Sequence, residues 1–393
     1  MPSLFTAALL DDPHTGYAAL RAAAPIQRTT TPDGAPVWLV THYQDVRRLL
    51  ADDRLSLNKA TASTVGDHGA SMPPELDAHM LNADAPDHTR LRRLVSKAFT
   101  PRSIEAMRPV VVRRVDELLA ALEDRESVDL MAALAMPLAL SVICDVLGIE
   151  EADRADFRQW TNTLRSPAPD AAVASRQALK SMHAFLRDLI AGKRAGTPGD
   201  DLLSQMIAAR DEGDRLSEGE LVAMAFLLLF AGYDNAANLL GTTLLALLTH
   251  PPVLHDLRSG TVPLDQILDE ALRWETPSML ASRRFAREDI EFDGHVIAAG
   301  DRVWLSLVSA NRDEDQFAAA SEFRPDRGGA GHLGFGHGLH YCLGAALARL
   351  EASVAIEALV TRLPRLALAR PPEELEWAAS YRSRGLVTLP VTW

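Results

Sequence analysis

One stretch of the chain places a cysteine in a glycine-rich loop directly ahead of an apolar helical segment. The stretch runs from 335 to 344 and has the sequence FGHGLHYCLG. The free backbone N–H groups and the positive dipole end of a helix beginning near Gly344 would stabilise a Cys342 thiolate. Glycines at 336, 338 and 344 allow positive φ values and a close approach of amides to the sulfur. A lone cysteine in a turn is most often inert packing, but this setting predicts a thiolate that binds iron.

Charged residues recur upstream at helical spacing. Glu270 and Arg273 lie three residues apart, so their side chains share a helix face and can pair. His88 and Arg92 lie four apart and also share a face. Taken alone, the first pair would be a surface ion pair worth under about 1 kcal/mol, and the second a solvated basic turn.

The sequences of several motifs resemble those of one protein family. The cysteine stretch continues through Ala345-Ala-Leu-Ala-Arg349, and together they resemble the cysteine-ligand signature of the cytochrome P-450 monooxygenases, which bind haem through a thiolate. Glu270 and Arg273, about 70 residues before the cysteine, resemble the family's Glu-x-x-Arg motif. Phe323-Arg-Pro-Asp-Arg327 is similar to the segment whose arginine joins that pair. The resemblance implies a structural role for Glu270, Arg273 and Arg327.

The resemblance implies haem b as the cofactor and assigns residues to it. Cys342 would be the axial ligand of the iron. Histidines and arginines would hold the two haem propionates, and arginine offers the bidentate fork that carboxylates prefer. Arg283 and Arg287 compete with Arg284 for one of these roles. The cofactor-binding set is His88, Arg92, Arg284, His340, Cys342, Phe335, Gly336 and Ala231.

A second functional segment is Ala231-Gly232-Tyr233-Asp234-Asn235. In the family, a small residue and a glycine loosen the helix over the haem, and an acid followed usually by threonine binds oxygen and relays protons. We expect Asp234 and Asn235 to be catalytic, although Asn235 replaces the alcohol and an amide does not pass a proton as a hydroxyl does. A water held by both residues, a substrate hydroxyl, or chemistry needing fewer protons would each account for Asn235. A purely structural Asn235 is a further alternative.

The expected substrate pocket is mostly apolar, which suits a substrate with an apolar carbon skeleton that a few polar groups orient. Each pocket residue could equally belong to the hydrophobic core and contact no substrate. The segment Leu57 to Leu81 is rich in small and polar residues and predicts a mobile lid, and the tip from Tyr381 to Arg384 could add a contact. The pocket residues are Leu81, Leu227, Phe230, Ala231, Leu280 and Ser282.

Two kinds of evidence indicate the fold class. The resemblance implies a mainly α fold with a smaller β region and haem between the long central helix and the cysteine loop, and the periodicity of apolar residues supports the helical content. No linker, repeat or low-complexity block divides the 393 residues, so we expect a single domain over 1–393. Apolar residues at helical spacing predict helices over 109–122, 131–147, 221–248, 264–275 and 343–363. Strands are predicted over 37–41, 290–292, 302–307 and 386–392.

Composition limits the partners and the compartment. A net charge of -13 argues against nucleic acid, which calls for a basic face. Two cysteines, Cys144 and Cys342, indicate a reducing compartment without disulfides. The segment 221–248 is apolar enough for a membrane span, but Asp234, Asn235 and Asn238 near its middle favour a core helix. We therefore expect a cytoplasmic monomer that uses no membrane.

These inferences predict an enzyme that inserts one oxygen atom from O2 into a small apolar, natural-product-like substrate, by hydroxylation or epoxidation. Nothing in the chain resembles a flavin or iron–sulfur module, so electrons would come from a ferredoxin and ferredoxin reductase. A basic cluster would receive the acidic ferredoxin. A peroxide-driven or oxidative-coupling enzyme and a non-catalytic haem sensor are the alternatives. The cluster comprises Arg93, Lys97, Arg102 and Arg108.

Overall fold

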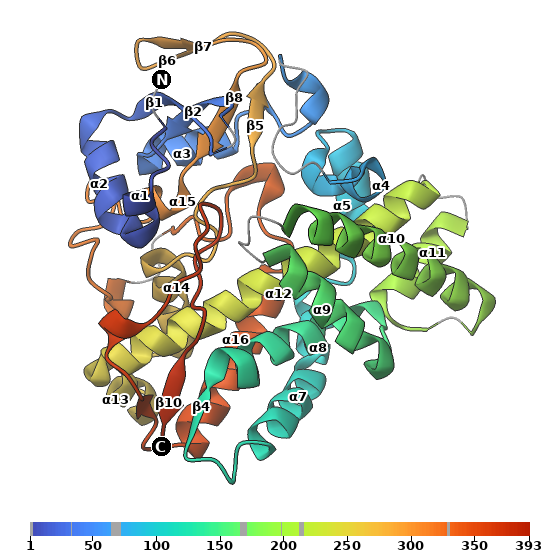
Figure 1. Ribbon diagram of the computed structural model, residues 1–393, viewed down its shortest axis with the longest axis vertical. Helices are drawn as coiled ribbons and strands as arrows, with labels where there is room; N and C mark the ends of the chain where they lie inside the picture. The colour runs from blue at the N-terminus through green and yellow to red at the C-terminus, as the bar shows by residue number, and fades with distance from the viewer. Residues whose placement is uncertain are drawn as a thin grey trace.

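A long helix, α12 (Glu218–Thr249), crosses the middle of the computed structural model and separates a mixed β region from a helical region (Figure 1). The structure describes residues 3–32, 34–63, 72–165, 171–197, 199–211, 216–327 and 331–393. Ser217 caps α12: its side chain accepts a hydrogen bond from the Glu220 amide, and the Glu220 side chain accepts one from the Ser217 amide. Since α12 is buried along most of its length, it provides the scaffold that both regions share.

The β region surrounds a five-stranded sheet of order β1-β2-β8-β5-β3, which lies with α1 to α3 on one side of α12 (Figure 1). The β2 and β8 strands pair in parallel, with Trp38 opposite Val303, and the other pairs are antiparallel. Its strands are β1 (Ile26–Thr30), β2 (Pro36–Val40), β3 (Leu55–Ser56), β5 (Arg284–Ala286) and β8 (Arg302–Leu305). The smaller sheets contain β4 (Ser127–Asp129), β10 (Pro390–Thr392) and β9 (Ala367–Leu368), and the hairpin β6 (Ile290–Phe292) with β7 (His295–Ile297).

Helices surround both the sheet and α12 (Figure 1). Those near the sheet are α1 (Ala7–Asp11), α2 (Pro13–Ala23), α3 (Tyr43–Leu50), α4 (Pro74–Asp77), α5 (Asp87–Ser96) and α15 (Leu307–Ala310). Those of the helical region are α6 (Pro101–Ala106), α7 (Arg108–Ala120), α8 (Met136–Leu147), α9 (Arg154–Arg165), α10 (Ala171–Ala195) and α11 (Leu202–Asp211). Three more, α13 (Pro251–Ser259), α14 (Leu264–Trp274) and α16 (Ala345–Arg362), follow in the chain. One continuous apolar core joins α7, α8, α12, α14 and α16.

Short turns of helix connect these elements. The single turns are η1 (Lys59–Thr61), η2 (Met80–Asn82), η4 (Glu151–Asp153), η5 (Pro325–Arg327), η6 (Gly338–His340) and η7 (Pro372–Glu374). A π-helical turn, η3 (Met131–Ala135), precedes α8, so the helix predicted over 131–147 is present but begins with wider turns.

The mainly α fold with a smaller β region is confirmed. All five predicted helices form, with ends shifted by a few residues. Two predicted strands are shorter than expected: β8 ends at Leu305 because α15 begins at Leu307, and only Pro390–Thr392 of 386–392 pairs as a strand. The α12 helix alone is long and apolar enough, within the described residues, to cross a membrane, and 61% of its apolar window is buried inside the protein.

Candidate active site

The cysteine loop folds back on itself ahead of α16. The Cys342 amide donates a hydrogen bond to the Phe335 carbonyl at 2.9 Å, which closes the loop. Gly336 and Gly338 have φ values of 72° and 73°, as the sequence predicts. Gly344, which was also expected to have a positive φ, has a φ of -83°. A glycine is therefore not needed there for a left-handed turn. A Cβ at Gly344 would meet no protein atom within 4 Å, although this residue lines a cavity.

The Cys342 side chain faces that cavity, and we call it the Cys342 cavity. Burial raises the pKa of the Cys342 thiol, while the Gly344 amide, at the start of α16, donates to the sulfur and lowers it. The amide is the donor that the sequence predicts. A bound cation would favour the thiolate further, and the thiolate is the state that binds iron.

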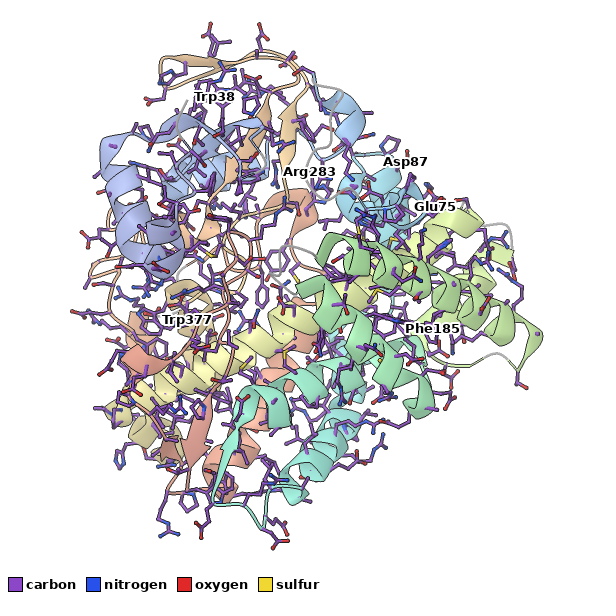
Figure 2. All side chains as sticks on the ribbon, viewed as in Figure 1. Trp38, Glu75, Asp87, Phe185, Arg283 and Trp377 are labelled. Carbon is purple, nitrogen blue, oxygen red and sulfur yellow. The ribbon has the colours of Figure 1, made fainter. Side chains whose placement is uncertain are left out.

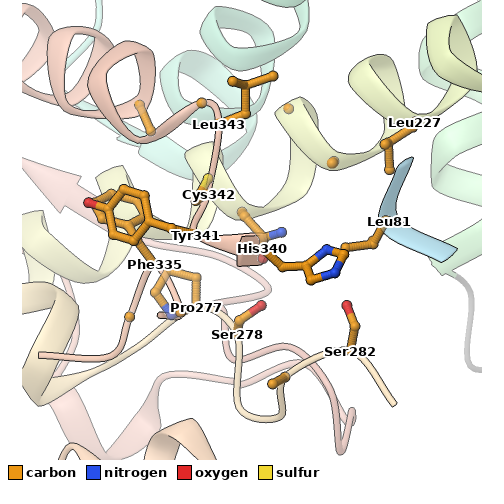
Figure 3. Close-up of a pocket in the computed structure, with 18 of the residues that line it drawn as sticks. Leu81, Leu227, Pro277, Ser278, Ser282, Phe335, His340, Tyr341, Cys342 and Leu343 are labelled. Atoms are coloured by element: carbon orange, nitrogen blue, oxygen red, sulfur yellow. The ribbon is translucent and has the colours of Figure 1, made fainter. Parts of the chain in front are cut away.

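The walls of the Cys342 cavity come from segments far apart in the sequence. Figure 3 shows Leu81 and Leu227 across the cavity from Phe335 and Tyr341, with Ser278 and Ser282 along another edge. The α12 helix contributes Ala231, Gly232, Asn235, Ala236 and Leu239. Predicted site residues that line the cavity are Leu81, His88, Arg92, Leu227, Ala231, Asn235, Leu280, Ser282, Arg284, Phe335, Gly336, His340 and Cys342.

Four basic side chains meet at one edge of this cavity. The His88 and His340 rings lie 4.2 Å apart between centroids. The Arg92 guanidinium donates to the carbonyls of Leu339 at 3.1 Å and Tyr341 at 2.7 Å, which ties α5 to the cysteine loop. Arg284 is 2% exposed, and its guanidinium donates to the Ser282 carbonyl at 2.8 Å. Neither Arg283 nor Arg287 lines the cavity.

Burial disfavours the charges of this basic edge. It lowers the pKa of His340 to about 3, with the neighbouring His88 adding to the effect, and it lowers the pKa of Arg284 to about 10. Both ring nitrogens of His88 are buried without a hydrogen-bond partner among the described residues.

These donors fit the two carboxylates of haem. Buried polar groups are normally hydrogen-bonded, so the unpartnered His88 nitrogens and the buried Arg284 fit an anionic group beside them. Propionates supply such groups, and Gly344 leaves room beside the cysteine. The residues that could hold haem are Cys342 at the iron and His88, Arg92, Arg284 and His340 at the propionates.

The α12 segment differs from the expectation in two respects. The helix is continuous through Ala231 and Gly232, and a Cβ at 232 would lie 2.9 Å from the Ile143 side chain, so this glycine serves close packing against α8. Asn235 is exposed to the cavity, but Asp234 points aside and accepts a 3.2 Å hydrogen bond from the Asn238 amide. The predicted catalytic pair is therefore split, with only Asn235 at the cavity wall.

Phe230 was expected on the cavity side of α12, but it is not among the residues that line the cavity. Each helical residue advances by about 100°, so Phe230 lies about 60° from Leu227, on the side of Leu227 opposite to Ala231 and Asn235. Its ring instead stacks on Phe226, with centroids 5.6 Å apart, and the residue is 40% exposed.

The C-terminal tip, 381–384, adds no side chain to the cavity lining. Its Tyr381 hydroxyl donates to the Phe5 carbonyl, and the Arg384 guanidinium donates to Glu275 at 2.8 Å. The tip was expected to add a contact, but its polar groups tether the segment near the N-terminus and Glu275, which follows α14.

The lid predicted over 57–81 lies partly outside the described residues, at 64–71. Leu57, Met80 and Leu81 line the cavity, and Leu76 of α4 is fully buried. Both ends of this segment and Leu76 are therefore packed against the rest of the protein, while several residues between them are exposed.

In the basic cluster, Arg108 donates to Glu105 at 2.6 Å, which offsets its charge, whereas Arg93 and Lys97 are exposed.

The predicted structural triad is present. The Arg273 guanidinium donates to both Glu270 oxygens at 2.7 and 2.8 Å, and Arg327 donates to one of them at 3.1 Å. Glu270 and Arg273 are 4% and 2% exposed, so this is a buried ion pair and not a surface one.

Several cavity residues were not predicted. Glu351 of α16 is buried and lines the cavity, and burial raises its pKa well above the usual range. Its spacing of four from Leu347 on α16 would have indicated a shared face. Ser278 and Ile143 carried no such sequence signal, because the chain crossings that bring them to the cavity are tertiary.

Comparison with known proteins agrees with this geometry. A family model described as cytochrome P450, written here P-450, matches residues 168–260 and 263–376. Cytochrome P-450 107B1 of Saccharopolyspora erythraea is 43% identical over 98% of this chain and 96% of that protein. Mycinamicin IV hydroxylase/epoxidase of Micromonospora griseorubida is 38% identical over 96% of this chain and 94% of that protein. The tirandamycin C-bound P-450 monooxygenase TamI superposes with a TM-score of 0.92 at 42% identity, covering 98% of both chains.

The chain belongs to the cytochrome P-450 family. It is a haem monooxygenase of the bacterial type, with haem b held by an axial cysteine thiolate. The family acts on apolar substrates with O2 and takes its electrons from redox partners. Haem bound through a thiolate supplies the activation of O2 by favouring O–O cleavage.

Proposed function

We propose that this enzyme inserts one oxygen atom into an apolar, polyketide-like natural product, by hydroxylation or epoxidation. The observation that carries the proposal is the Cys342 cavity, where a cysteine sulfur and a basic edge share one space with a largely aliphatic wall. The names of its relatives support the substrate class: one is a hydroxylase/epoxidase of mycinamicin IV, and another binds tirandamycin C.

Each part of the cavity has a separate task in this proposal. Cys342 binds the iron, and His88, Arg92, Arg284 and His340 bind the propionates. Leu81, Leu227 and Leu280 exclude water and hold the substrate skeleton by packing.

Protons would reach the reaction through Asn235. Its side-chain amide faces the cavity and can hold a water in position as donor and acceptor. Asp234 lies beside it on α12, outside the cavity lining, and accepts a hydrogen bond from Asn238.

We further propose that the chain is a single-domain, cytoplasmic monomer that receives electrons from a ferredoxin and its reductase. A basic docking face for an acidic ferredoxin would lie at the exposed Arg93 of α5 and at Lys97, which ends that helix, close to the cavity residue Arg92.

The test is turnover under ¹⁸O2 with a ferredoxin, its reductase and NADPH, against a panel of macrolides and linear polyketides. One ¹⁸O atom in the product, and none with Cys342→Ser, is the expected result. Product that forms only with peroxide would indicate the peroxide-driven alternative. NADPH consumption that no panel member stimulates would contradict the substrate class.

A further inference from the structure

One wall of the Cys342 cavity is an irregular stretch, residues 277–282, which we call the wall segment. It lies between α14 and β5, and two isolated β-bridges hold it, from Ser278 to Ser383 and from Leu280 to Ser306. Because such bridges are short, the position of the wall segment depends on the parts of the chain behind it. Its members in the cavity lining are Pro277, Ser278, Leu280, Ala281 and Ser282.

The C-terminal tip, 381–384, supports the wall segment through its backbone. The Met279 amide donates to the Arg382 carbonyl at 2.8 Å, and the Arg384 amide donates to the Pro277 carbonyl at 2.8 Å. Residues 381–384 do not belong to the cavity lining. The tip is therefore a second layer behind the wall that faces the cavity.

The N-terminal segment, residues 3–17, holds this tip in turn. The Tyr381 hydroxyl donates to the Phe5 carbonyl at 3.0 Å, and the two rings meet edge to face with centroids 5.3 Å apart. The Phe5 ring also meets the Trp304 ring of β8 edge to face, at 5.1 Å. In Figure 1 the red C-terminal segment accordingly runs beside the blue helices α1 and α2. Phe5 thus joins the tip to the sheet.

A buried carboxylate links the same two segments a second time. Glu275, the residue after α14, is 4% exposed. The Arg384 guanidinium donates to it at 2.8 Å, and the His14 Nε2 lies 2.9 and 3.1 Å from its two oxygens. Although burial raises the pKa of Glu275, contacts that include His14 and Arg384 lower it to about 2. The carboxylate is therefore ionised and only accepts, so the His14 ring is the donor.

A second group fixes the Arg384 guanidinium. It lies 3.6 Å from the centre of the Trp377 ring, which is a close cation–π contact. Figure 2 shows Trp377 below the β region that contains Trp38. Since Glu275 and Trp377 both hold this side chain, a change at Glu275 reaches the backbone of the tip.

Apolar packing couples the N-terminal segment to the wall directly. One hydrophobic cluster contains Phe5, Leu9 and Tyr17 of the N-terminal segment together with Met279 and Leu280 of the wall segment. Leu280 also lines the cavity, so its side chain contacts both the N-terminal cluster and the cavity. A close-packed interior transmits the displacement of one member to its neighbours.

We infer that His14 and Tyr381 are positioning residues for the substrate, because they hold the tip that supports the wall segment. Neither residue lines the cavity, so each acts through the backbone of 277–282. The inference rests on the proposed function, in which Leu280 packs against the substrate skeleton. Loss of either contact should loosen the wall and weaken the binding of ligands long enough to reach it, while a ligand confined to the iron binds as before.

The test compares two ligands of the ferric holoprotein in optical titrations. Imidazole binds the iron without reaching the wall, whereas 1-dodecylimidazole adds an apolar chain that packs on it. Loss of one hydrogen bond predicts that His14→Ala and Tyr381→Phe each weaken the binding of 1-dodecylimidazole about five-fold and leave that of imidazole unchanged. His14→Gln keeps a donor and should retain the native affinity. The matched control is His42→Ala, which removes a 3.0 Å hydrogen bond to the Arg21 carbonyl of α2 that involves no residue of the tip.

An unchanged ratio of the two affinities in His14→Ala and Tyr381→Phe would overturn the inference. So would an equal loss for both ligands or a loss of haem, because these residues would then act on the haem or on the whole fold. Equal binding of both ligands by the unaltered protein, or a five-fold loss in His42→Ala, would overturn it as well. Since no turnover is needed, a failure of the proposed oxygenation would appear separately, as absence of labelled product with the difference between the ligands intact.

Discussion

Replacing Arg273 by Met should destabilise the protein far more than any surface arginine replacement. The Arg273 guanidinium makes two hydrogen bonds to Glu270 and donates to the carbonyls of Asn311, Ala320 and Glu322 at 2.8 to 3.0 Å. Breaking one partner of a buried ion pair costs about 3 to 5 kcal/mol. Glu270 would keep the Arg324 amide at 2.7 Å and the Arg327 guanidinium at 3.1 Å, so we expect the lower end, about 3 kcal/mol.

The measurement is urea unfolding of the holoprotein, followed by circular dichroism and by haem absorbance, with the free energy taken from the midpoint and the slope. Arg324→Met is the matched control, since its guanidinium pairs with the exposed Asp326 and should cost under about 1 kcal/mol. Equal losses in Arg273→Met and Arg324→Met would refute the reasoning.

Three further variants test other parts of the site. Asn235→Leu should lower the product formed per NADPH by about ten-fold at unchanged haem content, whereas Asn235→Thr should not lower it. If both variants form the same amount of product per NADPH, Asn235 positions no water. Arg284→Leu should speed haem loss to an excess of a haem scavenger by about ten-fold, while Arg287→Leu, whose native guanidinium pairs with Asp84, should not; equal rates would remove Arg284 from the propionate site. Contacts with His14, Arg384 and Arg312 outweigh burial and lower the pKa of the Glu275 carboxyl from 4.5 to about 2, so its contribution to stability is complete above about pH 4.5 and is lost as pH falls toward 2. Acid titration of the unfolding free energy should show a loss of about 3 kcal/mol in that window that Glu275→Gln lacks, and identical curves would contradict it.

Local chemistry made part of this site predictable. Cys342, the glycines at 336 and 338 and the pair of Glu270 with Arg273 are encoded by short spacings, and the structure has them as expected. The resemblance, and not the spacing, assigned Arg284 in preference to Arg283. Helical periodicity likewise located α12 and α16, because their apolar residues repeat over many turns.

Two features could not be predicted from the sequence: which face of a helix meets the cavity, and which segments distant in the chain pack together. Phe230 and Asp234 lie on a helix that is apolar on nearly every side, so periodicity could not say which face meets the cavity. The short strands were missed or overextended because pairing partners, and not local preference, decide where they end. Ile143 and Ser278 reach the cavity only through packing between segments distant in the chain.

The contact between Gly232 and Ile143 couples the shape of the substrate cavity to the packing of α8 on α12. Both residues line the cavity, and a methyl group at 232 would come within 2.9 Å of Ile143. A larger residue at 232 therefore has room only if the residue at 143 becomes smaller. Variants selected for a new substrate should change these two positions together, which moves the hollow along the cavity wall while leaving the total volume and the helix spacing nearly constant.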